Sequence, residues 1–181
     1  MNQPTVASSG LTALYPGSFD PFHNGHLDVV EQSVELFGSV VIAVMHNPQK
    51  PSGLIDLGHR VELVRACVAH LPTVRVAAHP GLAVDAARVE AVSFIVKGLR
   101  TPGDFEVEQQ MAHTNYSVTG VRTVYLPCRS DQSFISSRFI RDIAQYRGPV
   151  GHLVPVPVAA ALAGIFGEPA ADHRPSTERK S

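Results

Sequence analysis

The chain lacks the features of a membrane protein, a secreted scaffold or a nucleic-acid-binding protein. It has no apolar run of 18 residues, so we expect no transmembrane helix, and residues 1–10 lack the basic start and apolar stretch of a secretory signal. The formal net charge is −1, which provides no overall basic field for nucleic acid. The two cysteines, Cys67 and Cys128, match no metal or redox spacing, so a reducing cytoplasm is the simplest setting.

The rest of the composition is that of one globular domain. With 181 residues, 44% of them hydrophobic, the chain is long and apolar enough to build a core. We expect a flexible arm over residues 1–10, a single domain over 11–167 and a disordered tail over 168–181. The tail is rich in proline, serine and charge, and it has too few large apolar residues to offset the entropy lost on ordering.

Short β-branched runs alternate with helical patterns along the domain. The expected strands cover 11–15, 40–45, 74–78, 94–97 and 123–126. The expected helices cover 26–37, 56–71, 83–92, 102–116, 136–146 and, as a last C-terminal helix, 156–166. This alternation predicts an α/β fold with a five-stranded parallel sheet and right-handed crossovers. We therefore expect the chemistry in the loops that follow the strands.

The segment Pro16–His26, PGSFDPFHNGH, favours a loop that binds nucleotide phosphates. Its two glycines let the backbone approach a ligand, and the second falls with His26 at a helix start, where free N–H groups favour an anion. The Ser18 hydroxyl and the ring N–H groups of His23 and His26 can donate to phosphate oxygens. Taken alone, the pattern also fits a tight turn with two surface histidines. A zinc site is a further alternative, although no cysteine or third histidine lies nearby.

Later loops carry cationic and hydroxyl groups. Lys97 and Arg100 bracket a glycine after a strand, which indicates either a phosphate clamp or ordinary surface charges. Glu108, near a helix start, could accept hydrogen bonds from a base or ribose, orient Arg100 or complement the helix dipole. The pair Ser136–Ser137 provides natural N-caps, and the arginines that follow favour a second anion site. Lys50, taken alone, is best interpreted as an exposed loop lysine.

Four segments, in order, resemble the bacterial-type phosphopantetheine adenylyltransferases of the HxGH nucleotidyltransferase superfamily: YPGSFDPFHNGH, NPQKP, VKGLRTPGDFEVE and SFISS. The similarity runs from about Tyr15 to Val156, and the KGLR…DFExE segment selects this family within the superfamily. The resemblance implies a Rossmann-like, doubly wound fold, usually assembled as a homohexamer. It also implies a cytoplasmic, ATP-binding transferase of coenzyme A biosynthesis. With Mg²⁺, such an enzyme joins ATP and 4′-phosphopantetheine to give dephospho-coenzyme A and pyrophosphate.

Matched position by position, the resemblance implies three sets of site residues. The expected catalytic residues are His26, Ser18, Lys50 and Arg100. The expected ATP contacts are Ser18, Phe19, His26, Gly98, Leu99, Arg100, Glu108, Gln132, Ser133, Phe134, Ile135, Ser136, Ser137 and Arg138. The expected phosphopantetheine contacts are Ser18, Lys50, Leu82, Ala83 and Lys97. No protein metal ligand is expected, because ATP phosphates supply oxygen ligands to Mg²⁺.

Two alternatives remain at this point. Another superfamily member, such as a nicotinate-mononucleotide adenylyltransferase or a cytidylyltransferase, would share the HxGH and ISS motifs, but the KGLR…DFExE segment argues against it. A non-catalytic nucleotide-binding protein would not need both histidines together with Lys50 and Arg100.

Gln132 stands where the family often has an aromatic residue, and Arg138 replaces a small hydroxyl residue. No nucleic-acid or membrane partner is expected.

Overall fold

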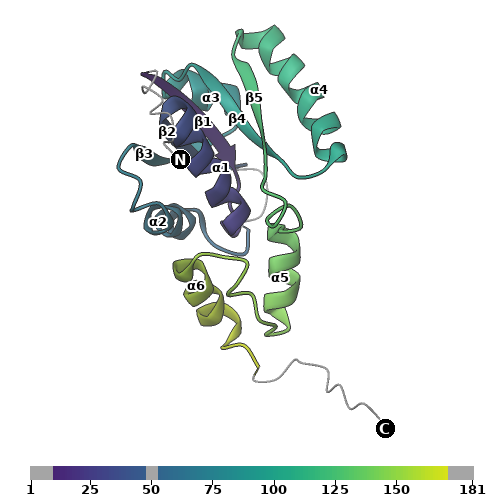
Figure 1. Cartoon of the computed structure of the whole chain (residues 1–181). Coiled ribbons are helices and arrows are strands. Elements are labelled where there is room, and N and C mark those ends of the chain that lie inside the picture. Colours follow the sequence, from purple (N-terminus) through teal and green to yellow (C-terminus); the bar gives the residue numbers. More distant parts are fainter. Residues whose placement is uncertain (1–9, 48–52, 171–181) are drawn as a thin grey trace, which may run out of the picture.

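The computed structural model describes residues 10–47 and 53–170, which form a parallel five-stranded sheet with helices on both faces (Figure 1). The strands are β1 (Leu11–Gly17), β2 (Gly38–His46), β3 (Val74–Pro80), β4 (Phe94–Leu99) and β5 (Arg122–Pro127). The helices are α1 (Asn24–Phe37), α2 (Leu57–Cys67), α3 (Ala83–Val89), α4 (Pro102–Thr119), α5 (Ser137–Gln145) and α6 (Val156–Phe166). Within these described ranges, no helix is both long and apolar enough to cross a membrane.

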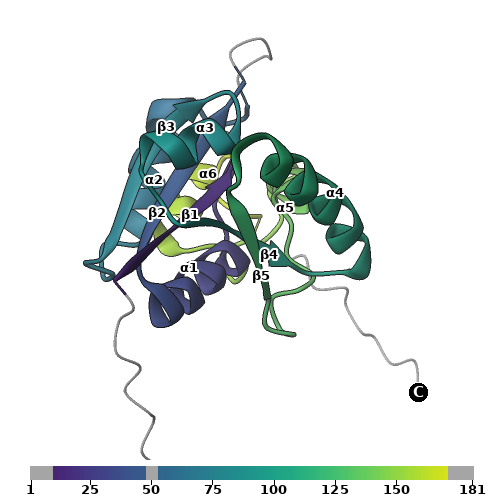
Figure 2. The same ribbon diagram turned by 90° about the horizontal axis from the view of Figure 1, so that it is seen from above.

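The strands lie in the order β3-β2-β1-β4-β5, which confirms the doubly wound α/β prediction. The chain builds outward from β1 to β3, then returns to place β4 on the other side of β1, where Leu14 lies opposite Ile95. The two faces are covered by different helices, with α1 and α2 on one side and α3 and α4 on the other (Figure 2). The carboxyl ends of β1 and β4 therefore lie side by side at the point where the winding direction reverses, which is where open α/β sheets bind ligands.

The larger core lies between the sheet and the helices α1, α2, α5 and α6. The apolar run Val40–Val44 of β2 is fully buried, as expected for a strand covered on both faces. Cys67, at the end of α2, is buried in this core, as its place in an apolar pattern indicates. The smaller core lies under α3 and includes Val84 and Ile95. By contrast, α4 has no buried residue, so this helix adds little to the hydrophobic core of the chain.

Several element boundaries differ from the sequence-based ones. The strand β4 runs on to Leu99, so Lys97 and Gly98 lie within the strand and not after it. A Cβ at Gly98 would lie 2.7 Å from a methyl carbon of Val29, and this glycine therefore lets α1 pack closely against β4. The helix α2 ends at Cys67, earlier than expected, because the chain turns there and continues towards β3.

Candidate active site

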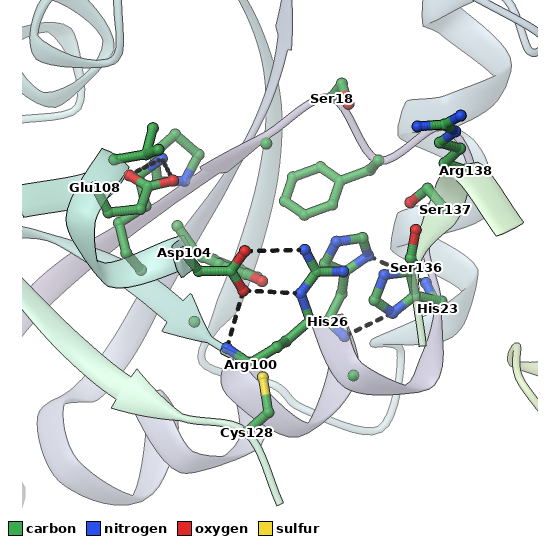
Figure 3. A pocket seen from close by; sticks show the side chains of 18 of the residues that line it. Ser18, His23, His26, Arg100, Asp104, Glu108, Cys128, Ser136, Ser137 and Arg138 are labelled. Atoms are coloured by element: carbon green, nitrogen blue, oxygen red, sulfur yellow. Dashed lines mark hydrogen bonds and ion pairs between the residues drawn. The ribbon is translucent and has the colours of Figure 1, made fainter. Parts of the chain in front are cut away.

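A pocket of about 550 Å³ opens at the carboxyl ends of β1 and β4, where the first turns of α1, α4 and α5 converge (Figure 3). It brings together many of the residues that the sequence singles out. The expected site residues that line it are Ser18, Phe19, His26, Lys97, Gly98, Arg100, Glu108, Ser136, Ser137 and Arg138. His23 and Gly25 line it as well, so the first loop and the two later loops meet at one place.

The other expected residues that the structure describes do not line this pocket. Leu82 and Ala83 lie at the start of α3, where Leu82 is 64% exposed. The stretch 132–135 precedes α5, and within it the side chain of Ile135 is buried in the core while Phe134 is 65% exposed. Leu99 also lies outside the pocket lining. Lys50 lies outside the described residues.

The side chains of His23 and His26 cap the start of α1 reciprocally. The backbone N–H of His26 donates to Nδ1 of His23 at 3.3 Å, and the backbone N–H of His23 donates to Nδ1 of His26 at 3.2 Å. The two rings stack with their centroids 3.5 Å apart. Because Nδ1 of each neutral ring accepts a hydrogen bond, the ring proton lies on Nε2. The backbone thus fixes the tautomer of His26 and leaves its Nε2–H as a hydrogen-bond donor.

Aromatic side chains surround these histidines. The ring centroids of Phe19, Phe22 and Tyr15 lie 5.1, 5.5 and 6.3 Å from that of His26. Burial lowers the pKa of His26 well below 6.5, and positive charge on neighbouring groups adds to the effect. Burial likewise lowers the pKa of His23 to about 3. Both rings are therefore neutral at pH 7, and His26 is equipped to donate a hydrogen bond without carrying a charge.

Arginines from two other helices hold the loop between β1 and α1. Phe19 has a φ of 48°, a left-handed conformation that is costly for a residue other than glycine and needs support. Arg60, buried on α2, donates from Nη1 to the carbonyl oxygen of Ser18 at 2.7 Å. Arg141, on α5, donates to the carbonyl oxygen of Asp20. Neither arginine is among the residues that the resemblance implies, although Arg141 follows the serine pair whose arginines favour an anion site.

On the β4–α4 side, the cations of the pocket are paired with carboxylates. Nζ of Lys97 lies 3.1 Å from Oε2 of Glu108, and Nε of Arg100 lies 3.1 Å from Oδ2 of Asp104. Arg100 also donates from Nη1 to the carbonyl oxygen of Ile135 at 3.1 Å. Burial would raise the pKa of Asp104, but the hydrogen bonds from Arg100 outweigh it and the net shift is downward. Glu108 therefore pairs with Lys97 and does not orient Arg100. Asp104 is the carboxylate that orients Arg100.

The start of α5 differs from its predicted capping. Ser136 occupies the N-cap position, but its side chain makes no capping hydrogen bond, and the Ser137 hydroxyl donates to the carbonyl oxygen of Pro21 at 2.9 Å. The hydroxyl of Ser137 thus joins α5 to the first loop, which capping rules do not predict. Arg138 is exposed and lies on the same side of the pocket as the two serines (Figure 3).

The pocket is richer in basic than in acidic side chains. Four cations line it, namely Lys97, Arg100, Arg138 and Arg141, against the two carboxylates of Asp104 and Glu108. In the part of the chain that the structure describes, no group of three or more His, Cys, Asp or Glu residues could hold a metal ion. Neutral donors beside an excess of cations suit a ligand that carries several phosphates.

Comparisons with known proteins agree with this geometry. Residues 14–143 match the cytidylyltransferase-like family model. The phosphopantetheine adenylyltransferase of Thermosynechococcus vestitus is 43% identical over 91% of this chain and 99% of its own length. That of Actinobacillus succinogenes is 44% identical over 83% of this chain and 94% of its own. A solved structure titled as a putative nicotinate-nucleotide adenylyltransferase from Vibrio parahaemolyticus has a TM-score of 0.60 at 18% identity, covering 83% of this chain and 97% of that one. This likeness concerns the fold alone.

Proposed function

Because the chain belongs to the cytidylyltransferase-like family, and within it to the phosphopantetheine adenylyltransferases, we propose that it transfers the adenylyl group of ATP to 4′-phosphopantetheine. The products are dephospho-coenzyme A and pyrophosphate, which makes the chain an enzyme of coenzyme A biosynthesis. Relatives named for this activity match it over nearly their whole length, and this is what distinguishes the proposal from other reactions of the superfamily.

One structural observation carries the chemistry: the tautomer of His26 is fixed with its proton on Nε2, in a pocket lined by four cations. A phosphate oxyanion is already a nucleophile, so in-line attack on the α-phosphorus of ATP needs no side-chain base. The protein must align the two anions and stabilise the charge that develops between them. A neutral donor with a fixed direction and a set of cations is suited to that task.

The residues then have distinct roles in the proposal. His26, with the Ser18 hydroxyl, donates to the α-phosphate as negative charge builds on it. Lys97, together with Lys50 from the family pattern, holds the phosphate of phosphopantetheine. Arg100 and the start of α5 at Ser136 stabilise the departing pyrophosphate, and the ring of Phe19 packs against that of His26 in a T-shaped contact.

We assign the other expected contacts to the two substrates as the family pattern implies. The ATP set extends to Gly98, Leu99, Glu108, Ser137 and Arg138 and to the stretch 132–135. Leu82 and Ala83 are assigned to the pantetheine arm, because that arm is long enough to leave a pocket in which its phosphate is bound.

We assign Mg²⁺ as the cofactor, entering with ATP. The two carboxylates of the pocket, Asp104 and Glu108, are engaged with cations, so the ligands for the metal would come mainly from phosphate oxygens and water. When bound, the metal ion would neutralise part of the charge on the phosphates.

For the assembly we propose the homohexamer of the family. The exposure of α4 supports this proposal, because no residue of this helix is buried in the single chain. The large apolar side chains that α4 exposes are Phe105, Val107, Met111, Tyr116 and Val118. We also propose that the enzyme works in the cytoplasm; its two cysteines are free thiols, as is usual in a reducing compartment.

A substrate panel tests the function. The protein is mixed with ATP or CTP, and with 4′-phosphopantetheine, nicotinate mononucleotide or glycerol phosphate, and pyrophosphate is measured. We expect release only with ATP and phosphopantetheine together, accompanied by dephospho-coenzyme A. Release with nicotinate mononucleotide or with CTP would reassign the chain to another branch of the superfamily, and no release with any pair would make it a non-catalytic nucleotide-binding protein.

A further inference from the structure

The loop between β5 and α5, residues 128–136, contains much of the expected ATP-binding stretch, and Asp28 holds its first residues. Asp28 lies on α1, two residues after His26, and its side chain is buried. Its Oδ2 accepts a hydrogen bond from the backbone N–H of Arg129 at 3.1 Å and another from Nε2 of Gln32 at 3.0 Å. Its Oδ1 lies 3.0 Å from Nε of Arg129. Gln32 also donates to the carbonyl oxygen of Pro127 at 3.3 Å, so two α1 side chains hold the start of this loop.

Arg100 holds the other end of the same loop. Its Nη1 donates to the carbonyl oxygen of Ile135 at 3.1 Å. Between the two ends, the backbone N–H of Gln132 donates to the carbonyl of Arg129 at 2.9 Å, and the N–H of Ile135 donates to the carbonyl of Gln132 at 3.1 Å. A continuous path of hydrogen bonds thus joins the carboxylate of Asp28 to the guanidinium of Arg100.

We infer that Asp28 is a positioning residue for ATP, which acts through Arg129 to set the place of the 132–135 stretch without touching the substrate. This rests on the proposed function. Asp28 is not part of the pocket lining, and its buried carboxylate accepts two hydrogen bonds at Oδ2 and forms an ion pair with Arg129 at Oδ1. Hydrogen bonds to an ionised acceptor are stronger than those between neutral groups, so loss of the charge loosens the start of the loop. The groups proposed for phosphopantetheine, Ser18 and Lys97, lie on other segments and are unaffected.

The matched variants are Asp28→Asn and Glu31→Gln, both of which remove a carboxylate charge from α1. Glu31 lies 3.5 Å from His70 and does not contact the 128–136 loop. For Asp28→Asn we expect the KM for ATP to rise about tenfold, the scale of one lost charge-assisted hydrogen bond. The KM for phosphopantetheine should stay within about twofold, and Glu31→Gln should change neither constant. Equal increases in both constants, or an unchanged KM for ATP, would overturn the inference.

Arg129→Ala provides a second variant that cannot unfold the chain through burial, because the Arg129 side chain is 64% exposed. It should raise the KM for ATP about threefold, as expected for a partly exposed ion pair. Added to Asp28→Asn it should have no further effect, because the carboxylate partner is already absent. A further loss in the double variant would mean that Arg129 binds ATP directly, and would contradict the assignment.

Direct ATP binding, measured by titration calorimetry on the wild type and Asp28→Asn, separates the two proposals. If the wild type releases no pyrophosphate from ATP and phosphopantetheine, the proposed function fails. The comparison of ATP affinities still decides the role of Asp28, since weaker binding by the variant supports it and equal binding refutes it.

Discussion

On the β1–α1 side of the pocket the groups that face a ligand are neutral and largely buried, whereas on the β4–α4 side they are charged, more exposed and paired with carboxylates. The side chains of His23 and His26 each accept the backbone N–H of the other at the start of α1, and their rings stack among aromatic rings. Arg100 is bound to Asp104, on a helix with no buried residue. The first side is fixed before any ligand arrives. On the second side, phosphate oxygens must compete with carboxylates that already hold the cations.

The difference separates two tasks of phosphoryl transfer. A donor that acts on the charge developing in the transition state must be aligned in advance, and burial provides that alignment. Cations that bind and release phosphates need to exchange partners, and a paired, accessible cation can do so. Substitutions that alter one side at a time test this division.

His26→Ala is expected to have the largest effect. It should lower kcat by roughly 10²–10³, the scale for removing one preorganised donor from an active site. The measurement is pyrophosphate release at saturating ATP and phosphopantetheine. His23→Asn is the control, because asparagine is also a good N-cap residue and the variant keeps the ring of His26. Turnover of His26→Ala close to the wild type would remove His26 from the chemistry.

Arg100→Met should have the next largest effect, on the other side of the pocket. We expect kcat/KM for ATP to fall about 50-fold, because the variant loses hydrogen bonds of a charged group both to ATP and to the 128–136 loop. Asp104→Asn keeps the shape of the partner and frees Arg100, so it should change kcat/KM by less than about threefold. If Asp104→Asn were as damaging as Arg100→Met, the pair would serve to place α4 and not to bind phosphate.

The pH dependence of stability should show the smallest effect, about 2 kcal/mol from His23. The pKa of His23 is lowered to about 3, from an ordinary value of 6.5, so between these values the unfolded chain binds more protons than the folded one. The contribution of His23 to the free energy of unfolding is therefore fully present well above pH 6.5, and it is lost as the pH falls towards 3. Lowering the pH from 7 to 5 should cost the wild type about 2 kcal/mol more than His23→Asn. Urea unfolding of both proteins at each pH measures it; equal losses would mean that His23 is not buried in its neutral form.

Patterns local in the sequence predicted much of the fold and of the pocket. The apolar run of β2 and the alternation of elements were enough for the sheet, because burial on both faces and period 3.6 are visible along the chain. The carboxyl ends of neighbouring parallel strands meet at one edge of the sheet. The predicted strand ends therefore indicated which loops come together, and His26, Lys97 and Arg100 do line one pocket.

Contacts between distant segments could not be predicted in this way. The pattern around Arg60 predicts a helix, but not that its side chain reaches a carbonyl 42 residues earlier. The same holds for Asp28 and the backbone of Arg129, which are 101 residues apart. Asp104 had a local signal, since it lies four residues after Arg100 near a helix start, where such pairs form. The Ser137 hydroxyl was predicted as a cap because capping is the commonest role of a serine there, but tertiary contact with Pro21 takes it instead.

The strand order also has a consequence for the synthesis of the chain. Once Pro80 has left the ribosome, β1, β2 and β3 can pair, but the edge of β1 that later joins β4 through Leu14 and Ile95 is still open. Lys97 of β4 and Arg100 just after it follow, and Arg141, which holds the first loop in place, is among the last pocket residues to be made. A nascent chain that has not yet reached α5 therefore carries the histidine loop without the contacts from Ser137 and Arg141 that hold this loop in the finished protein.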